Sequence, residues 1–279
     1  MVARKIAFQG EPGAFSNQAV AAVFPEDEPL SCLTFEDTIG AAQSGTADLA
    51  MVPIENSLYG RIADIHHLLP QSGLYIIAEH YQPIRMNLLG VPGARLEDIK
   101  TVQSLNVALG QCRRFIKQRR FKTISSVDTA GSAREVAERG DKSVAAIASR
   151  LAGDIYGLEV IAENIEDAAH NTTRFLVMSR IQQLPPADAG KVKTTFVFRV
   201  RNVPAALYKA MGGFATNGIN MTKLESYMVD GSFTATQFYA DIEGHPDDRG
   251  VQLAFEELRF FTDHMQVLGV YPKTHHYVG

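Results

Sequence analysis

Asp48–Ser57 reads Asp-Leu-Ala-Met-Val-Pro-Ile-Glu-Asn-Ser, and its change from apolar to polar residues indicates the fold class of the first part of the chain. Residues 48–54 are almost continuously apolar, which is typical of a strand buried on both faces of a sheet. Glu55, Asn56 and Ser57 follow directly, beyond the carboxyl end of the strand, where α/β folds place ligands. The same residues would also cap a following helix, so both roles stay open.

Around this strand, strand patterns alternate with helix patterns. Further strands are expected at residues 5–9, 31–35, 74–78, 86–91, 123–127, 143–147 and 175–178. Helices are expected between them at residues 16–24, 36–43, 62–69, 105–118, 129–139 and 148–156. This alternation predicts a layered α/β domain.

The last third of the chain has a different order of elements. Residues 182–191 contain two prolines and a glycine and predict a linker. Beyond it, strand, helix, strand, strand, helix and strand are expected at residues 194–200, 207–214, 220–229, 233–242, 251–258 and 266–271. Asp230-Gly231 predicts a hairpin between the two central strands. The β-α-β-β-α-β order is that of a ferredoxin-like module.

Composition and length limit the classes of function. The chain has 279 residues, which suggests two domains, and its hydrophobic fraction of 46% is enough for a packed core. Its formal net charge is −4, and no nucleic-acid surface is indicated. The one basic run, residues 113–122, indicates a solvated helix face, with a phosphate or partner site as the alternative. Because neither a secretory leader nor an apolar run of membrane-spanning length is evident, we expect a cytoplasmic protein without nucleic-acid or membrane partners. Cys32 and Cys112 lack metal-ligand spacing, so no metal site is predicted.

Two further turns place polar groups at the start of a helix. The Gly10–Ser16 loop follows the first strand, and its glycines would let the backbone approach a ligand beside helix N-terminal amides. It lacks both the dinucleotide-binding glycine fingerprint and the lysine of a P-loop. Asp128–Ser132 is a similar strand-to-helix turn. Helix capping would also account for either segment.

A fourth polar segment, Asn171–Phe175, precedes the last strand of the first part. Two hydroxyls and a guanidinium make it suitable for binding an anion. Adjacent strand residues face opposite sides, so Thr173 and Arg174 would not both face one ligand in a regular strand. A structural salt bridge would also explain Arg174.

Together, these four segments resemble the prephenate dehydratase family over essentially the whole chain. The most specific match is Thr173-Arg174-Phe175, which corresponds to the family's Thr-Arg-Phe motif. Pro53–Ser57 with Gly60, and the Gly10–Ser16 loop, occur in the family's order. The last third resembles an ACT domain, the amino-acid-sensing module that is appended to these enzymes.

The resemblance implies an α/β fold with a bilobed catalytic domain, similar to periplasmic binding proteins, followed by a ferredoxin-like βαββαβ ACT domain. The implied boundaries are a catalytic domain at 1–181, a linker at 182–191 and the ACT domain at 192–279. Within the catalytic domain, one lobe would comprise about residues 1–80 with 165–181, and the other about residues 81–164. The ligand would lie between these lobes.

The implied reaction is the decarboxylating dehydration of prephenate to phenylpyruvate in L-phenylalanine biosynthesis, without a cofactor. Formation of an aromatic ring drives it, and a donor near the departing ring oxygen would lower the barrier. The family assigns that donor role to Thr173. The substrate-binding residues that the resemblance implies are Ser16, Asn56, Ser57, Thr129, Ala130, Gly131, Ser132, Thr172, Arg174 and Phe175.

For the ACT domain, the resemblance implies that L-phenylalanine binds between paired modules, and hence a homodimer or homotetramer. The implied contacts are Ala205, Ala206, Leu207, Asn220, Met221, Thr222, Leu224, Glu225 and Ser226. Two departures from the family pattern bear on feedback inhibition: Ala205 stands where the family has glycine, and Tyr227-Met228 where it has Arg-Pro. A module that only dimerises is the alternative.

Three other functions compete with this one. The Gly10–Ser16 loop also resembles that of arogenate dehydratases, which differ in substrate. A bilobed solute-binding protein would share the fold, although the fused sensor module argues against it. The intact Thr173-Arg174-Phe175 motif argues against a regulator without catalytic activity.

Overall fold

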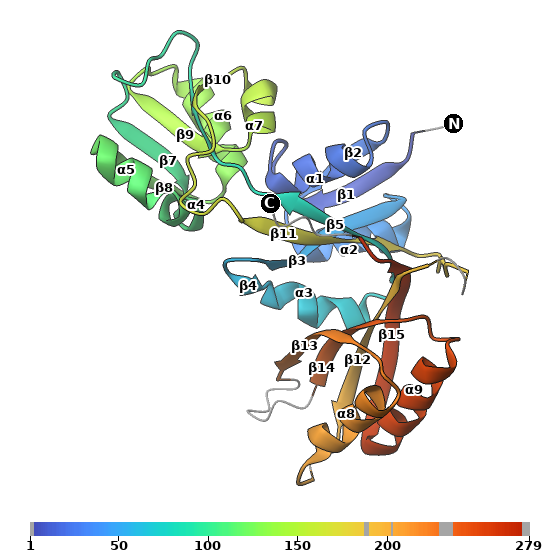
Figure 1. Ribbon diagram of the computed structural model, residues 1–279. Helices are drawn as coiled ribbons and strands as arrows, with labels where there is room; N and C mark the ends of the chain where they lie inside the picture. The colour runs from blue at the N-terminus through green and yellow to red at the C-terminus, as the bar shows by residue number, and fades with distance from the viewer. Residues whose placement is uncertain (1–2, 187–189, 202, 229–236, 275–279) are drawn as a thin grey trace. The chain divides into compact units, whose positions relative to one another are not determined.

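The computed structural model describes residues 3–186, 190–201, 203–228 and 237–274 (Figure 1). Contacts divide the chain into two compact units. The first contains Met1–Ile62 and His80–Phe175, and the second contains Ala63–Glu79 and Leu176–His276. This division differs from the predicted domain and lobe ranges, which remain predictions, and part of the predicted linker lies outside the described residues. Among the described residues, no helix combines the length and apolarity that a membrane span requires.

The first lobe is built on parallel strands of the first unit. β1 (Lys5–Gln9) pairs in parallel with β2 (Glu28–Cys32) on one side and with β3 (Leu49–Asn56) on the other. β11 (Thr172–Ser179) follows β3 in the strand order, and the short β4 (Gly60–Arg61) pairs with the end of β3. The first six residues of β3 are all buried, which confirms the buried strand expected from the apolar run.

Two helices connect these strands. α1 (Phe15–Val23) lies between β1 and β2, and α2 (Phe35–Ser44) begins with a capping box. In that box, the Thr34 hydroxyl accepts a hydrogen bond from the Asp37 N–H, and the Asp37 carboxylate accepts one from the Thr34 N–H. Because Thr34 serves as the cap, the strand expected at 31–35 is wrong in position: β2 lies three residues earlier in the chain.

The second lobe has a separate sheet in the order β10-β6-β9-β7-β8. Its strands are β6 (Asn87–Gly90), β7 (Thr101–Leu105), β8 (Lys122–Ser126), β9 (Val144–Ala148) and β10 (Glu159–Ala162). Its helices are α4 (Asn106–Gln111), α5 (Arg113–Arg119), α6 (Thr129–Arg139) and α7 (Arg150–Tyr156). β7 pairs in parallel with β8 and β9, whereas β6 pairs antiparallel with β9 and β10. The inner strand β7 and the edge strand β10 have no counterpart among the expected strands. The helix expected at 105–118 is split because Cys112 leaves the helical conformation.

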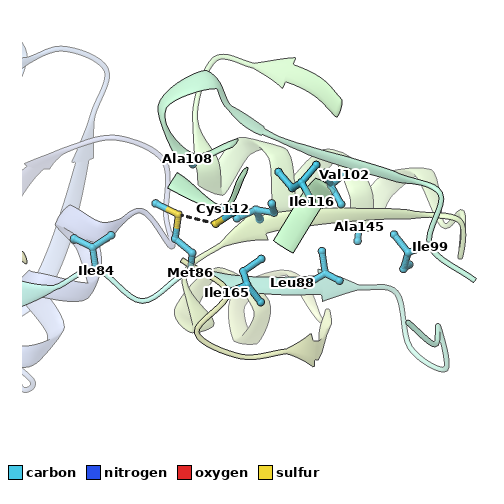
Figure 2. Close-up of a cluster of buried hydrophobic side chains, with 11 residues drawn as sticks. Ile84, Met86, Leu88, Ile99, Val102, Ala108, Cys112, Ile116, Ala145 and Ile165 are labelled. Atoms are coloured by element: carbon cyan, nitrogen blue, oxygen red, sulfur yellow. Dashed lines mark hydrogen bonds between the residues drawn. The ribbon is translucent and has the colours of Figure 1, made fainter. Parts of the chain in front are cut away.

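Buried aliphatic side chains form a core of this lobe, and Cys112 lies among them (Figure 2). Cys112 is fully buried, and its Sγ lies 3.6 Å from the Sδ of Met86. Burial raises the pKa of the Cys112 thiol, and the nearby charge of Glu166 adds to the rise. Burial also raises the pKa of the half-buried Cys32 thiol. Both cysteines are therefore neutral thiols at physiological pH.

Native protein is expected to react slowly with a thiol reagent such as dithionitrobenzoate, because the thiolate is the reactive form and both thiol pKa values are raised. Cys112, which is buried as well, should not react before the protein unfolds. The release of thionitrobenzoate measures this, with denatured protein as the control in which both cysteines react. Rapid labelling of Cys112 in folded protein would contradict the packing in Figure 2.

The second unit contains the ferredoxin-like module. Its elements are β12 (Val192–Val200), α8 (Ala206–Thr216), β13 (Met221–Tyr227), β14 (Gln237–Glu243), α9 (Arg249–Phe261) and β15 (Thr262–Pro272). The strands are ordered β13-β14-β12-β15 and pair antiparallel. Phe196, Phe214 and Phe255 pack between the sheet and the helices. The βαββαβ order is confirmed, whereas the predicted Asp230-Gly231 turn lies outside the described residues.

A segment from the first third of the chain packs in this same unit. It comprises α3 (Ala63–Leu68), the 3₁₀ turn η1 (Leu69–Gln71) and the start of β5 (Tyr75–Pro83). β5 pairs in parallel with β15 at Ile76 and Gly269. A side chain at position 269 would overlap the carbonyl of Ile76, so this close approach requires glycine.

Candidate active site

A cavity of about 290 Å³ lies in the first unit, beside the carboxyl end of β3. Its walls come from elements of both lobes: α1, β3 and β11 on one side, and α4 and α6 on the other. The residues that line it are Phe15, Ser16, Pro53, Asn56, Ile62, Ile84, Met86, Leu105, Val107, Ala108, Gln111, Thr129, Thr173 and Phe175. Most of this wall is apolar, with five hydroxyl or amide side chains set into it.

Thr173 and Asn56 form the polar centre of this cavity. The Asn56 Nδ2 donates to Thr173 Oγ1 at 3.0 Å and to Asn171 Oδ1 at 2.8 Å. The Asn56 Oδ1 accepts from the backbone N–H groups of Leu58 and Tyr59, which fixes the orientation of the amide. Because the Thr173 oxygen accepts from Asn56, its own hydrogen is available for another acceptor.

Arg174 lies next to Thr173 in β11 but is not among the lining residues. Its side chain is 3% exposed, and its Nη1 donates to Glu55 Oε1 at 2.9 Å. Phe175, one residue further along, returns to the cavity. This alternation places Thr173 and Phe175 on one face of the strand and Arg174 on the other, where it joins β11 to β3.

Ser57 and Thr172 bond to each other's backbone rather than lining the cavity. The Ser57 N–H donates to the Thr172 carbonyl at 2.9 Å, and the Thr172 N–H donates to Ser57 Oγ at 3.0 Å. Ser57 Oγ donates in turn to the His170 carbonyl at 2.9 Å. Both residues thus hold the end of β3 against the start of β11.

The Asp128–Ser132 turn contributes only Thr129 to the lining. Asp128 caps α6 by accepting from the Gly131 N–H at 2.6 Å, and the Ser132 hydroxyl donates to the Asp128 carbonyl at 2.7 Å. Ala130, Gly131 and Ser132 are buried in the helix's first turn. Capping therefore accounts for Gly131 and Ser132, two of the four predicted binding residues in this segment.

The Gly10–Ser16 loop contributes Phe15 and Ser16 to the cavity, but its glycine at position 13 serves a different contact. Gly13 has φ +90°, and a Cβ there would lie 2.7 Å from the Cα of Ala152 in α7. Ser149 Oγ donates to the Gly13 carbonyl at 2.6 Å. Packing against the first turn of α7 accounts for the glycine at position 13, and the approach of a ligand to this loop stays a prediction.

Comparison with known proteins identifies the family. The family model described as prephenate dehydratase matches residues 6–183. The chain belongs to the prephenate dehydratase family. This confirms the expected enzyme class and the expected bilobed fold.

Three relatives align with nearly the whole length of this chain. A bifunctional N-acyl-homoserine lactone acylase/prephenate dehydratase from Komagataeibacter europaeus is 50% identical, covering 96% of both chains. Arogenate dehydratase/prephenate dehydratase 1 of Arabidopsis thaliana is 39% identical, covering 96% of this chain and 72% of the relative. The structure of a prephenate dehydratase in complex with L-Phe from Arthrobacter aurescens is 31% identical, with a TM-score of 0.87 over 96% of this chain and 90% of that one.

The cavity beside β3 has one polar residue that no sequence motif indicated. Gln111, at the end of α4, lines the cavity, is 9% exposed, and has a buried Oε1 without a hydrogen-bond partner among the described residues. A buried polar atom without a partner favours a site that a ligand or water completes. The sequence signal that could have identified Gln111 is its position as a polar residue on an otherwise apolar helix face.

None of the fourteen residues that line the cavity beside β3 carries a titratable side chain. Its hydrogen-bonding groups are the hydroxyls of Ser16, Thr129 and Thr173 and the amides of Asn56 and Gln111. Neutral groups of this kind can hold an anionic ligand by donating hydrogen bonds. Proton transfer by a charged acid or base is not available from this lining.

Gly13→Ala is expected to lower the free energy of unfolding by about 2–4 kcal/mol, because it combines a left-handed backbone with overlap on Ala152. Gly157→Ala is the matched control. Gly157 has φ +68° but nothing within 4 Å of its added Cβ, so that change should cost about 1–2 kcal/mol. Urea denaturation measures both. Equal effects of the two changes would argue against a close contact between Gly13 and α7.

The residues implied for L-phenylalanine lie in two parts of the ACT module. Ala205, Ala206 and Leu207 form the start of α8, while Asn220 precedes β13 and the others lie in it. Ala205 has φ +62°, a conformation that favours glycine. Alanine at this position therefore strains the backbone, and its contact with L-phenylalanine stays a prediction.

Proposed function

We propose that this chain converts prephenate to phenylpyruvate, carbon dioxide and water. The observation that carries the proposal is the Thr173 hydroxyl, which lines the cavity and accepts a hydrogen bond from Asn56 at 3.0 Å. In this reaction the ring carboxylate leaves as carbon dioxide, and its bonding electrons enter the ring. The hydroxyl on the opposite ring carbon leaves with a proton as water. A donor that bonds the departing oxygen stabilises the negative charge developing there.

Thr173 meets the geometric need for this donor. A free hydroxyl is a weak acid, so its contribution depends on how it is placed. Asn56 holds the hydroxyl through an amide whose orientation is fixed by Leu58 and Tyr59. A donor fixed in this way needs no reorganisation as the carbon–oxygen bond breaks.

The remainder of the cavity suits the rest of the substrate. Prephenate carries one carboxylate on its unsaturated ring and another on its pyruvyl side chain, and the cavity offers neutral donors at Ser16, Thr129 and Gln111. Apolar side chains, including Met86 and Phe175, line the space between these donors. Such a division between apolar walls and a few placed polar groups is typical of a small-molecule site.

The cavity favours prephenate over arogenate. Arogenate carries an ammonium group where prephenate has a ketone, and no aspartate or glutamate lines the cavity to pair with it. Ser16, Gln111 and Thr129 can donate to a ketone oxygen, whereas Asn56 Nδ2 already donates to Asn171 and Thr173. The proposal is therefore a preference for prephenate, although the name of the Arabidopsis relative includes both substrates.

The name of the Komagataeibacter relative adds an acylase activity. Amide hydrolysis by a serine or threonine needs an adjacent base to activate the nucleophile. Because no residue lining this cavity is titratable, the cavity favours dehydration, and the proposal covers dehydration alone.

Incubation of purified protein with prephenate, with arogenate and with an N-acyl-homoserine lactone tests the proposal. Chromatography should detect phenylpyruvate from prephenate, with a higher kcat/KM than for phenylalanine release from arogenate. No fatty acid should be released from the lactone. Absence of phenylpyruvate would overturn the proposed reaction, and a higher kcat/KM with arogenate would overturn the substrate preference.

We further propose that L-phenylalanine binds the ACT module and inhibits the enzyme, with paired modules forming the site. The Arthrobacter relative, crystallised with L-Phe, supports this effector. Titration of activity with L-phenylalanine, alongside light-scattering measurement of the molar mass, tests it. Binding without a change in activity would contradict regulation, and a monomer would contradict the paired site.

A further inference from the structure

A second cavity, of about 240 Å³, lies in the second unit on one face of the ACT sheet. Its floor is a row of side chains that are direct register partners in four adjacent strands: Tyr227, Gln237, Arg199 and His264. Direct partners lie on the same face of a sheet. Phe198, the neighbour of Arg199, points the other way into the core beneath α8 and α9. The cavity therefore lies on the face opposite these two helices.

Hydrogen bonds fix this row of side chains. Arg199 Nη2 donates to Gln237 Oε1 at 3.0 Å, and Gln237 Nε2 donates to the Tyr227 hydroxyl at 2.7 Å. Tyr227 and Gln237 are 3% and 5% exposed, so both are held within the packed sheet. The guanidinium of Arg199 is consequently positioned before any ligand arrives.

The other wall comes from α3 and η1, which contribute His67, Pro70 and Gln71. The ring of His67 meets that of Tyr227 edge-on, with centroids 5.2 Å apart. The preceding residue, His66, meets Tyr239 edge-on at 4.8 Å. Contacts of this kind hold the helix against the sheet and give the cavity a defined width.

The chemistry of the lining is that of a hydrogen-bond donor site. Its eight residues include one arginine, two histidines and three glutamines, and none of the eight is an aspartate or glutamate. Arginine is always charged and matches planar or tetrahedral oxyanions with paired N–H groups. The glutamine amides and the histidine rings can add N–H donors around the same ligand.

We propose that this cavity binds a small ligand through an oxyanion, either a carboxylate or a phosphate, with Arg199 as its principal partner and His67 and His264 beside it. None of the lining residues belongs to the set implied for L-phenylalanine. Ser226 of that set faces the other side of the sheet, whereas Glu225 of that set lies on the same face of β13 as Tyr227. The cavity shares no lining residue with that set, and the proposed site does not depend on the proposed reaction.

Isothermal titration of the full-length protein with inorganic phosphate and with benzoate, at constant ionic strength, tests the proposal. Saturable binding of at least one of them is expected, and Arg199→Gln should weaken it by about tenfold or more, because a charged hydrogen-bond donor is lost. A glutamine at position 199 can still donate a hydrogen bond to Gln237, so the row of hydrogen-bonded side chains on the sheet is preserved. Arg201→Gln is the matched control, since Arg201 is exposed and lies outside the cavity.

Each outcome has a defined meaning. Binding of phosphate alone, or of benzoate alone, supports the site and identifies the class of ligand. Equal binding by the Arg199 and Arg201 variants, or heat without saturation, would overturn it. A change of molar mass in Arg199→Gln without a change in binding would show that a second copy occupies the cavity, which also overturns it.

His264→Gln provides an independent variant if Arg199→Gln does not fold. His264 is exposed at the rim of the cavity, so its replacement should leave the fold intact. A loss of affinity by about threefold is expected, because one donor of several is removed. Unchanged affinity in this variant would then overturn the proposal. Binding of L-phenylalanine should be the same in every one of these variants.

Discussion

Thr173→Ala is expected to lower kcat for prephenate by about 10²–10⁴-fold, the range that a positioned proton donor contributes. KM should change little, because the lost interaction strengthens only as the carbon–oxygen bond breaks. The fold should survive, since the Asn56 amide keeps its bond to Asn171 Oδ1 at 2.8 Å after losing the one to Thr173. Phenylpyruvate formation measures kcat, and thermal unfolding followed by circular dichroism measures stability.

Two matched variants separate the hydroxyl from the rest of the side chain. Thr173→Ser keeps the hydroxyl and should retain activity within about tenfold, whereas Thr173→Val keeps the shape and should be as inactive as alanine. Full activity of the alanine or valine variant would refute the assignment. If activity fell only in step with the unfolded fraction, Thr173 would be a structural residue instead.

Lys193→Met is expected to lower the free energy of unfolding by about 3–5 kcal/mol, because it removes one partner of a buried ion pair. Lys193 Nζ lies 2.7 and 3.0 Å from the two carboxylate oxygens of Glu79. The side chains are 5% and 0% exposed, so water cannot replace the lost charge. Urea denaturation of the variant and the parent protein measures the difference.

Two further variants test the physical cause. Lys273→Met breaks an ion pair with Glu243 in which both side chains are about a third exposed, and should cost about 1 kcal/mol or less. Replacing both members of the buried pair, Lys193→Met with Glu79→Leu, should recover part of the loss, because no isolated charge remains. A Lys193 variant no less stable than the Lys273 variant would contradict the buried pair.

Local sequence predicted most elements and their type. The apolar run before Glu55 predicted β3 and its burial, and the period of the apolar residues near Leu207 predicted α8. Errors arose where one local signal outweighed another. Thr34 served as a helix cap, which ended the preceding strand early, and Cys112 broke a helix that the apolar pattern alone could not divide.

Within the candidate site, side-chain alternation in β11 predicted that Thr173 and Arg174 face opposite ways, as they do. The hydrogen-bond partners of Thr173 and Arg174 could not be predicted from the sequence. Asn56 and Glu55 are more than a hundred positions away in the sequence, and they meet β11 only because β3 lies next to it. Gln111 carries no motif and belongs to the cavity only through the position of α4.

The sequence by itself determined the family, the order of the elements and the hydroxyl at position 173, because these depend on residues close together in the chain. Only the tertiary structure decided that Gly13 serves a contact with Ala152, that Arg174 pairs with Glu55, and that residues 63–79 pack in the unit that holds the ACT sheet. Each of these is a contact between segments far apart in sequence. Packing and charge pairing select such contacts, and no local pattern records them.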